Sequence, residues 1–454
     1  MTQTAGVSND RIAALAAREA EAYSAARPKT RAALQAGAAN YLDGVPLHWM
    51  KDWPQPFPML VAQAKGATLV DIDGNELDDF CLGDTGSMFG HSPAPVARAI
   101  KQQAGNGLTY MLPTEDALAA AALLSATFGD MRWQIATTAT DANRFALRVA
   151  RAVTGRPKVL VFNGCYHGTI DEAMVTLDAD GTTITRPGLL GQAADLTLTG
   201  VCCEFNDLAG VEAALAKGDV AAILTEPVMT NSCMVLPEPG FHEGLRGLAT
   251  KYGTLLMIDE THTISSGHGG YTRVHGLKPD IFVVGKCVAG GMPTSVWGLS
   301  PEIAQRYLEV NAGRASGHSG MGTTLSANPM QFACLLATLT EVMTPAAYAH
   351  MEDGAARLAD GLSAVITRHN APWHVVRVGA RVEFICAPGP LQNGIEAAQA
   401  HIHPVESAVH TGLLNRGCLI APFHNMMLVS PATSRAQIDR LIRAFTSVLS
   451  ELFA

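Results

Sequence analysis

The sequence has few of the features that mark nucleic-acid-binding, disulfide-stabilised or membrane-spanning proteins. Its 454 residues carry a formal net charge of −9 without a basic block, which argues against nucleic acid or an acidic membrane surface as a partner. The nine cysteines form no Cys-x-x-Cys pair, so neither a zinc site nor a disulfide framework is predicted. No apolar run approaches membrane-spanning length, and residues 9–37 read as an amphipathic helix rather than a signal peptide. These absences favour a cytoplasmic protein.

Metal and dinucleotide signatures are also missing. His401 and His403 are close in sequence, but no third ligand is in sight, so no metal site is predicted. No Gly-x-Gly-x-x-Gly follows a predicted strand, which argues against an NAD-dependent oxidoreductase. What the sequence does contain is 48% hydrophobic and 16% charged residues, as in a globular chain. Its length suits two or three domains.

Predicted helices and strands alternate from residue 114 to about 330. This alternation predicts an α/β fold in which a largely parallel sheet is covered by helices on both faces. We place an N-terminal segment at 1–90, a large domain at 91–330 and a C-terminal α+β lobe at 331–454. The predicted strands are 134–137, 159–162, 220–224, 254–258 and 281–284. The predicted helices include 117–128, which precedes the first strand, and 140–154 and 241–251, which lie between strands.

One lysine stands where the predicted strand 281–284 ends. The chain breaks at Gly285 and presents Lys286, and Gly290 and Gly291 then permit close backbone approach. Burial beside an apolar strand favours the neutral, nucleophilic amine, which can form a Schiff base with an aldehyde. A lysine merely exposed at a strand end is the commoner arrangement, so the interpretation depends on other motifs.

Other segments have chemistry that fits such a lysine. The predicted strand before it ends at Asp259, and a carboxylate there can keep a ring nitrogen protonated. Residues 134–142 read as a strand, a turn of small hydroxylic residues and a helix start, where Thr140 can cap the helix and free N–H groups can hold a phosphate. Tyr166 offers an aromatic face for ring stacking. Residues 320–329 add glycines and hydroxyls. Each segment also has an ordinary structural explanation.

Taken in order, these motifs resemble the class III aminotransferases of the fold-type-I pyridoxal-phosphate enzymes, particularly the glutamate-1-semialdehyde aminomutase-like branch. The resemblance implies a mainly parallel, seven-stranded sheet with helices on both faces, and a small α+β domain built from the N- and C-terminal segments. It also implies pyridoxal 5'-phosphate as cofactor. The resemblance runs from about residue 60 to the C-terminus and is carried by residues 66–76, 90–91, 162–168, 226–227, 259–260, 280–293 and 324–329.

The resemblance assigns the chemical roles by position. Lys286 would hold the cofactor as an internal aldimine and would move a proton between the substrate carbon and the cofactor. Asp259 would pair with the pyridine nitrogen, and Tyr166 would stack on the ring. The partners would be a small-molecule amine or amino acid and a keto acid.

Further residues would bind the rest of the cofactor. Ala139 and Thr140 would meet the phosphate through backbone and hydroxyl, and Glu226 would lie near the cofactor. Thr324 would reach the phosphate of the neighbouring subunit, which implies a homodimer with sites at the subunit interface.

The sequence departs from the family pattern in three places. Residues 138–142 read Thr-Ala-Thr-Asp-Ala where the family usually has Ser-Gly-Thr/Ser-Glu-Ala, and 265–267 replace Gly-Phe-Arg with Ser-Ser-Gly. Thr261 replaces a valine and is followed by His262. These changes affect the substrate pocket more than the cofactor site. His262 and Trp49, from the aromatic and proline-rich loop at 45–58, are the candidate substrate residues, although the loop could equally be a packed connector.

The prediction is therefore a pyridoxal-phosphate-dependent aminotransferase. Transamination is favoured over the intramolecular amino shift because residues 315–321 do not reproduce the aminomutase's segment at this position, and its Arg-bearing N-terminal loop corresponds only roughly to 46–51. A glutamate-1-semialdehyde-type 2,1-aminomutase is the alternative. A homologue that binds the cofactor but has lost catalysis is another.

Overall fold

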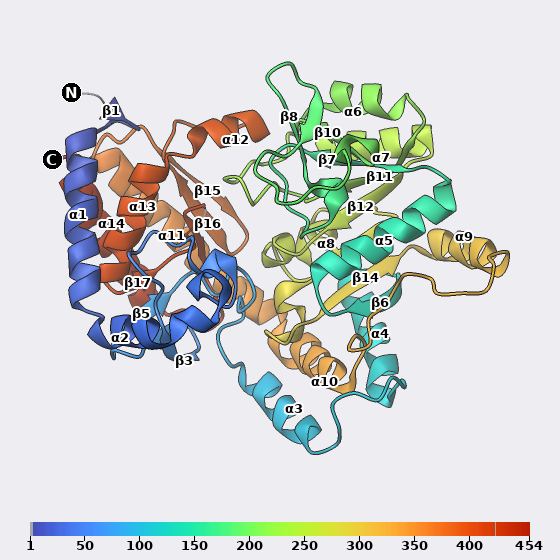
Figure 1. Ribbon diagram of the computed structural model, residues 1–454, viewed down its shortest axis with the longest axis horizontal. Coiled ribbons are helices and arrows are strands. Elements are labelled where there is room, and N and C mark those ends of the chain that lie inside the picture. The colour runs from blue at the N-terminus through green and yellow to red at the C-terminus, as the bar shows by residue number, and fades with distance from the viewer. Residues whose placement is uncertain (1–2, 423) are drawn as a thin grey trace. The chain divides into compact units, whose positions relative to one another are not determined.

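A seven-stranded sheet organises the larger of two units into which the chain divides (Figure 1). The computed structural model describes residues 3–422 and 424–454. The larger unit comprises Ala94–Pro345 and Leu391–Ala398, and the smaller unit comprises Met1–Pro93, Ala346–Pro390 and Gln399–Ala454. The chain leaves the larger unit at Pro345 rather than near the predicted residue 330, because the helix Pro329–Ala337 packs against helices of that unit.

The sheet of the larger unit is mainly parallel, as predicted. Its strand order is β10-β7-β11-β12-β13-β14-β6, and only β14 runs antiparallel to its neighbours. The strands are β6 (Arg132–Ala136), β7 (Lys158–Phe162), β10 (Gly200–Cys203), β11 (Val220–Thr225), β12 (Leu255–Asp259), β13 (Ile281–Val284) and β14 (Ser295–Leu299), and β8 (Val175–Leu177) pairs with β9 (Thr183–Thr185) outside the sheet.

Helices cover both faces of this sheet, because alternate side chains of each strand point to opposite sides. Met257 and Val283 pack in one buried cluster with residues of α5, whereas Phe282 contacts Phe128 of α4 on the other face, with ring centroids 5.3 Å apart. The helices of this unit are α3 (Ala94–Ala104), α4 (Glu115–Phe128), α5 (Ala139–Thr154), α6 (Leu208–Leu215), α7 (Phe241–Tyr252), α8 (Gly270–Val274), α9 (Pro301–Ala312) and α10 (Pro329–Ala337), and α12 (Gly394–Ala400) begins in it.

The smaller unit combines chain segments that are far apart in sequence. A four-stranded sheet of order β17-β5-β4-β3 joins strands from both ends of the chain, and β15-β16-β18 form a second sheet. The strands are β1 (Gln3–Thr4), β2 (Val7–Ser8), β3 (Val61–Lys65), β4 (Thr68–Asp71), β5 (Glu76–Asp79), β15 (His374–Val378), β16 (Arg381–Ile385), β17 (Cys418–Leu419) and β18 (Met426–Leu428), with helices α1 (Asn9–Ala25), α2 (Pro28–Gly37), α11 (Pro345–Arg368), α13 (His403–Asn415) and α14 (Arg435–Leu452).

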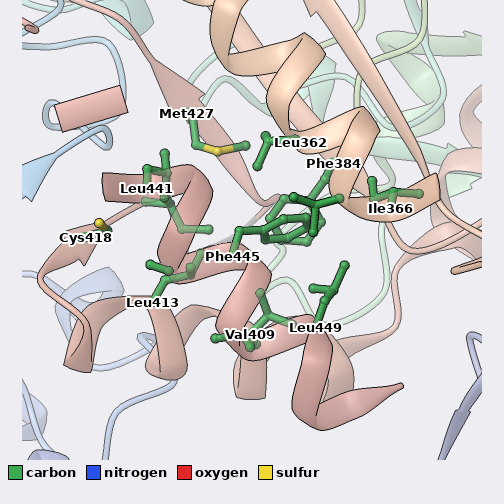
Figure 2. Close-up of a cluster of buried hydrophobic side chains, with 14 of the residues drawn as sticks. Leu362, Ile366, Phe384, Val409, Leu413, Cys418, Met427, Leu441, Phe445 and Leu449 are labelled. Carbon is green, nitrogen blue, oxygen red and sulfur yellow. The ribbon is translucent and has the colours of Figure 1, made fainter. Parts of the chain in front are cut away.

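The core of the smaller unit lies between its helices and the second sheet. Figure 2 shows Phe384 of β16 and Phe445 of α14 at its centre, and their ring centroids are 5.0 Å apart. Leu362 of α11 and Leu413 of α13 pack around them. This core buries the apolar faces of three helices, because an isolated helix has only marginal stability in water.

No single helix in residues 3–422 and 424–454 is long and apolar enough to cross a membrane. The segments Pro329–Val342 and Pro345–Arg368, taken as a pair, would meet the limits of length and composition.

Candidate active site

The register of two neighbouring strands brings the predicted aspartate and lysine to one edge of the sheet. Asp259, the last residue of β12, is paired with Val283 of β13, and Lys286 follows that strand after Gly285. Lys286 opens a 3-10 turn (Lys286–Ala289) with a φ of 51°, a left-handed conformation that is rare for a residue with a side chain. Such strain is concentrated at functional sites, where the surrounding structure holds it in place.

Asp259 is a buried carboxylate held by three N–H donors. Its Oδ2 accepts hydrogen bonds from Nδ2 of Asn143 and Nδ1 of His167, both at 2.9 Å, and its Oδ1 accepts from the backbone N–H of Thr261 at 3.1 Å. Burial alone would raise the pKa of Asp259, but these bonds and the charge of His167 outweigh it and lower that pKa. Burial likewise opposes the charged imidazole, yet Cys165 and Asp259 raise the pKa of His167. Both shifts favour the charged forms, an Asp259 carboxylate beside a His167 imidazolium.

The donor set around Asp259 fits a protonated ring nitrogen. An ionised carboxylate has about four acceptor positions, and the three N–H donors leave about one of them for a further donor. Within the described residues, Oδ1 of Asn143 and Nε2 of His167 are buried without a hydrogen-bond partner, so polar groups on this face still await a ligand. The N–H of a pyridinium ring would donate to the remaining acceptor position of the Asp259 carboxylate.

The start of α5 has a helix cap that differs from the prediction. Thr138, not Thr140, is the N-cap: its backbone is extended and its hydroxyl accepts from the N–H of Asp141 at 3.1 Å. The helix begins at Ala139, so Thr140 lies inside its first turn. The first N–H groups of a helix have no intrahelical acceptor, and the helix dipole adds positive charge there. Phosphate binding by Ala139 and Thr140 stays a prediction, and these two residues form the first turn of α5.

Close packing fixes the start of α5 against two neighbouring loops. A Cβ atom on Gly168 would lie 2.1 Å from Oγ1 of Thr140, and one on Gly285 would lie 3.0 Å from the methyl carbon of Ala139. Gly168, with a φ of 77°, therefore has no room for a side chain, and a side chain at Gly285 would require Ala139 to shift. The methyl group of Ala139, where the family usually has glycine, thus packs against the turn that carries Lys286.

The other predicted cofactor residues lie in different settings. Tyr166 follows β7 and is half-buried, next to His167. Thr324 is exposed, while Ser326 of the same loop lies 3.2 Å from the hydroxyl of Thr137, just before the cap of α5. Trp49 belongs to the smaller unit, in a 3-10 turn (His48–Met50), and is 40% exposed. Its substrate role stays a prediction.

His262 contacts the lysine itself. Its Nε2 faces Nζ of Lys286, and its Nδ1 lies 2.7 Å from the hydroxyl of Thr230. That hydroxyl donates to Oε2 of Glu226, which follows β11 and is buried. Burial is the main cause that raises the pKa of Glu226. Four side chains from three strand ends therefore form a continuous line of contacts ending at the amine.

The residues beside Asp259 also support the lysine turn. The hydroxyl of Thr261 accepts a hydrogen bond of 3.2 Å from the N–H of Gly285, so this threonine ties the end of β12 to the residue before Lys286. Glu260 instead accepts from the hydroxyl and N–H of Thr272, at 2.7 and 3.2 Å. Of the two adjacent carboxylates, Asp259 therefore belongs to the candidate site and Glu260 has a structural role.

Three site residues were not predicted from the sequence. Asn143 lies one helical turn after Ala139, so its position on the inward face of α5 could have been found from helical periodicity. His167 directly follows Tyr166. Thr230 lies in an irregular loop after β11 and carries no local signal. Its contact with His262 depends on the fold.

Comparison with known proteins agrees with this geometry. The family model "Aminotransferase class-III" matches residues 49–449. A glutamate-1-semialdehyde 2,1-aminomutase of Desulfitobacterium hafniense is 33% identical over 400 residues, which are 87% of this chain and 91% of that protein.

Solved structures are similar over nearly the whole chain. The crystal structure of a glutamate-1-semialdehyde aminomutase from Pseudomonas aeruginosa PAO1 has a TM-score of 0.96 and 47% identity, covering 98% of this chain and 100% of that one. A lysine-to-alanine variant of an aminomutase from the same organism, equally similar, was solved in complex with PMP. An omega-transaminase from Sphaerobacter thermophilus has a TM-score of 0.86 and 26% identity, covering 94% of this chain and 99% of that one.

These matches identify the fold and the cofactor. The fold is that of the fold-type-I enzymes, and the cofactor is pyridoxal phosphate, which similar structures carry in the PLP or PMP form. Because the family model spans most of the chain and the curated relatives share about a third of their residues with it, the chain belongs to the class III aminotransferase family.

Proposed function

We propose that this chain is a pyridoxal-phosphate-dependent 2,1-aminomutase of the glutamate-1-semialdehyde type. The observation that carries the amino-group chemistry is that a buried Asp259 with a lowered pKa and Lys286 follow one another at adjacent strand ends. The choice of an intramolecular shift is supported by the relatives, which are named as aminomutases at up to 33% identity, and by the 47% identical structure. The sequence alone had favoured transamination.

Each residue has a defined task in this proposal. Bound pyridoxal phosphate supplies an aldehyde carbon that condenses with amines and a ring that withdraws electrons from the substrate carbon. Lys286 provides the amine that holds the cofactor and carries a proton between substrate atoms. Asp259 keeps the ring nitrogen protonated, and His167 and Asn143 keep Asp259 in position. The start of α5 holds the phosphate.

Transamination is the second candidate, because the residues after Asp259 differ from the family pattern. Thr261 replaces a valine that usually packs against the cofactor face and is followed by His262, and 265–267 lack the usual Gly-Phe-Arg. An omega-transaminase also shares the fold at 26% identity. This candidate requires an external keto acid, whereas the aminomutase does not.

The two functions are separated by the need for a keto acid. The purified, cofactor-loaded protein is incubated with glutamate-1-semialdehyde alone. The isomer with the amino group moved from carbon 2 to carbon 1 has the same mass, so it is separated by chromatography and identified by its fragment ions. We expect turnover without any keto acid. Turnover that begins only after addition of pyruvate or 2-oxoglutarate would assign the chain to the transaminases.

Lys286→Ala tests the part common to both candidates. We expect loss of the visible absorbance of the lysine–cofactor bond and a fall in turnover on the order of 10²–10⁴-fold, because the acid–base step loses its group. Lys278→Ala, at an exposed lysine before β13, is the matched control and should behave as wild type. Retained turnover in Lys286→Ala would overturn the assignment.

We further propose that the enzyme is a homodimer in which Thr324 of each subunit reaches the phosphate bound by the other. Met111, Leu112 and Leu325 are 76%, 67% and 60% exposed. Met111, Leu112 and Thr324 line one surface hollow. Exposed apolar groups gathered in this way are typical of a protein interface. Dimerisation would cover them and bring Thr324 to its proposed ligand.

A further inference from the structure

The line of contacts from Glu226 to Lys286 has a defined hydrogen-bond direction. A protonated lysine can only donate, so Nε2 of His262 accepts from Nζ of Lys286. The ring of a neutral histidine then carries its hydrogen on Nδ1, which donates to Oγ1 of Thr230 at 2.7 Å. The Thr230 hydroxyl gives its single hydrogen to Glu226. Every group in this line therefore has a partner of the correct kind.

The opposite direction is satisfied equally well. When the lysine is neutral, Nε2–H of His262 donates to it, Nδ1 accepts from Thr230, and the Thr230 oxygen accepts from a protonated Glu226. Both arrangements use the same four side chains without moving a heavy atom. Asn231 is a weaker neighbour, with Nδ2 3.4 Å from both Nδ1 of His262 and Oε1 of Glu226.

The burial of Glu226 makes it a suitable proton acceptor. Its side chain is buried, and burial is the largest of the causes that together raise its pKa. Two other charged groups face it: His167 lowers its pKa, and Asp259 raises it. A carboxyl group with a raised pKa accepts a proton more readily at neutral pH than a solvated one.

We propose that Glu226, Thr230 and His262 form a proton relay that takes a proton from Lys286 and stores it on Glu226. The Nζ–H bond of Lys286 breaks as an Nε2–H bond forms on His262. The Nδ1–H bond of His262 breaks as Thr230 gains that hydrogen, and the former hydroxyl hydrogen of Thr230 passes to Oε2 of Glu226. Net charge is unchanged, and Lys286 becomes a neutral nucleophile without releasing a proton to solvent.

This inference rests on the proposed use of the Lys286 amine but goes beyond it. His262 touches the reacting amine and is a catalytic residue, whereas Thr230 and Glu226 act through it and are positioning residues. The relay replaces the substrate-binding role that the sequence suggested for His262. It also explains why a histidine follows Thr261 in this chain.

The first test follows cofactor attachment rather than turnover. Full-length protein is freed of cofactor, its fold is checked by circular dichroism, and the rate of visible absorbance growth on mixing with pyridoxal phosphate is measured from about pH 6 to about pH 8. In wild type the proton stays in the site, so the rate should depend weakly on pH. In Glu226→Gln, which keeps the shape and the acceptor oxygen, the proton must leave to solvent. Its rate should rise about tenfold per pH unit.

A matched pair at Thr230 separates the relay from packing. Thr230→Ser keeps the hydroxyl and should attach the cofactor within about twofold of the wild-type rate, whereas Thr230→Val keeps the shape and should be slower by on the order of tenfold near pH 7. Packing alone predicts the reverse, because valine fills the space of threonine and serine does not.

The outcomes distinguish the relay from the proposed function. Equal pH slopes in wild type and Glu226→Gln, or valine performing as well as serine, would overturn the relay even in an active aminomutase. The predicted slopes in a protein without 2,1-amino-shift activity would uphold the relay and remove the proposed function.

Discussion

The ionised state of Asp259 depends on a small set of side chains. Asn143 and His167 come from α5 and from the loop after β7, and both donate to one oxygen at 2.9 Å. In a buried site these charge-assisted bonds are strong, and removing one partner leaves the other uncompensated. The negative charge of Asp259 is therefore maintained by residues from two other parts of the sheet edge.

Asp259→Asn removes the charge while keeping the size of the side chain. We expect kcat to fall on the order of 10²–10³-fold, because an electrostatic partner that is fixed before reaction is lost. The NH₂ group of the new amide is a donor, so it cannot accept the hydrogen bonds that Asn143 and His167 now donate to the carboxylate. Steady-state kinetics at a fixed cofactor concentration measures the effect.

Its control is a change at the next residue. Glu260→Gln alters a carboxyl group that contacts Thr272 instead of the site. A similar loss of kcat in both variants would mean that the effect of Asp259→Asn is structural rather than electrostatic.

At the residue scale, the sequence predicted groups that follow strand ends. Lys286 and Asp259 were recognisable because apolar, β-branched runs precede them, and parallel strands present such positions at one edge. Thr230 was not recognisable, since it lies in an irregular loop and only the fold brings it to His262. The misplaced helix cap at Thr140 arose because three neighbouring threonines, at 137, 138 and 140, could each have capped the helix.

At the element scale, Glu260 links the end of β12 to α8. Its oxygens accept from the hydroxyl and N–H of Thr272, and a Cβ atom on Gly270 would lie 2.2 Å from its Oε1. Burial is the main cause that raises the pKa of Glu260 from 4.5 to about 7. The folded protein therefore binds a proton at Glu260 more tightly than the unfolded chain does.

This shift predicts a loss of stability with rising pH. The contribution of Glu260 is fully present below pH 4.5 and is lost as the pH rises through about 7. The shift corresponds to on the order of 3 kcal/mol. Glu260→Gln can accept from the N–H of Thr272 and donate to its hydroxyl at any pH. We expect its melting temperature to fall less than that of wild type between about pH 5 and about pH 8.

Circular dichroism melts at the two pH values measure this difference. Glu302→Gln, in the exposed first turn of α9, is the control and should follow wild type. An identical pH dependence in wild type and Glu260→Gln would show that Glu260 stays ionised in the folded protein.

Strands with a clear apolar pattern could be predicted from the sequence, and strands that contain glycine could not. The strand at 281–284 was predicted with the bounds that the structure gives, because its four residues are apolar and mostly β-branched. β10 and β14 were not predicted. β14 contains Gly298 and β10 begins at Gly200, and glycine weakens the local strand signal, so both depend on pairing with distant strands.

At the scale of the whole molecule, the N- and C-terminal segments join in the smaller unit. The parallel pairing of β17 with β5 connects residues near 418 to residues near 78. The resemblance to the family implied this assembly, whereas local patterning could not, because long-range strand pairing leaves no periodic trace in either segment. The two sequence segments gain a common core only when both are present.

The last prediction concerns the proposed subunit interface. Leu112→Asp places a charge among exposed apolar residues around Thr324, where burial against a second subunit would leave it unpaired. We expect the dissociation constant of the dimer to rise at least about tenfold, because each 1.4 kcal/mol of lost binding free energy raises Kd by a factor of ten. Analytical ultracentrifugation measures the mass, and absorbance of retained cofactor reports the loss of Thr324 from the neighbouring site.

Leu190→Asp, at a leucine that is 97% exposed elsewhere in the larger unit, is the matched control. A dimer in Leu190→Asp and a monomer in Leu112→Asp locate the interface, and a stable dimer in both would place it on another surface.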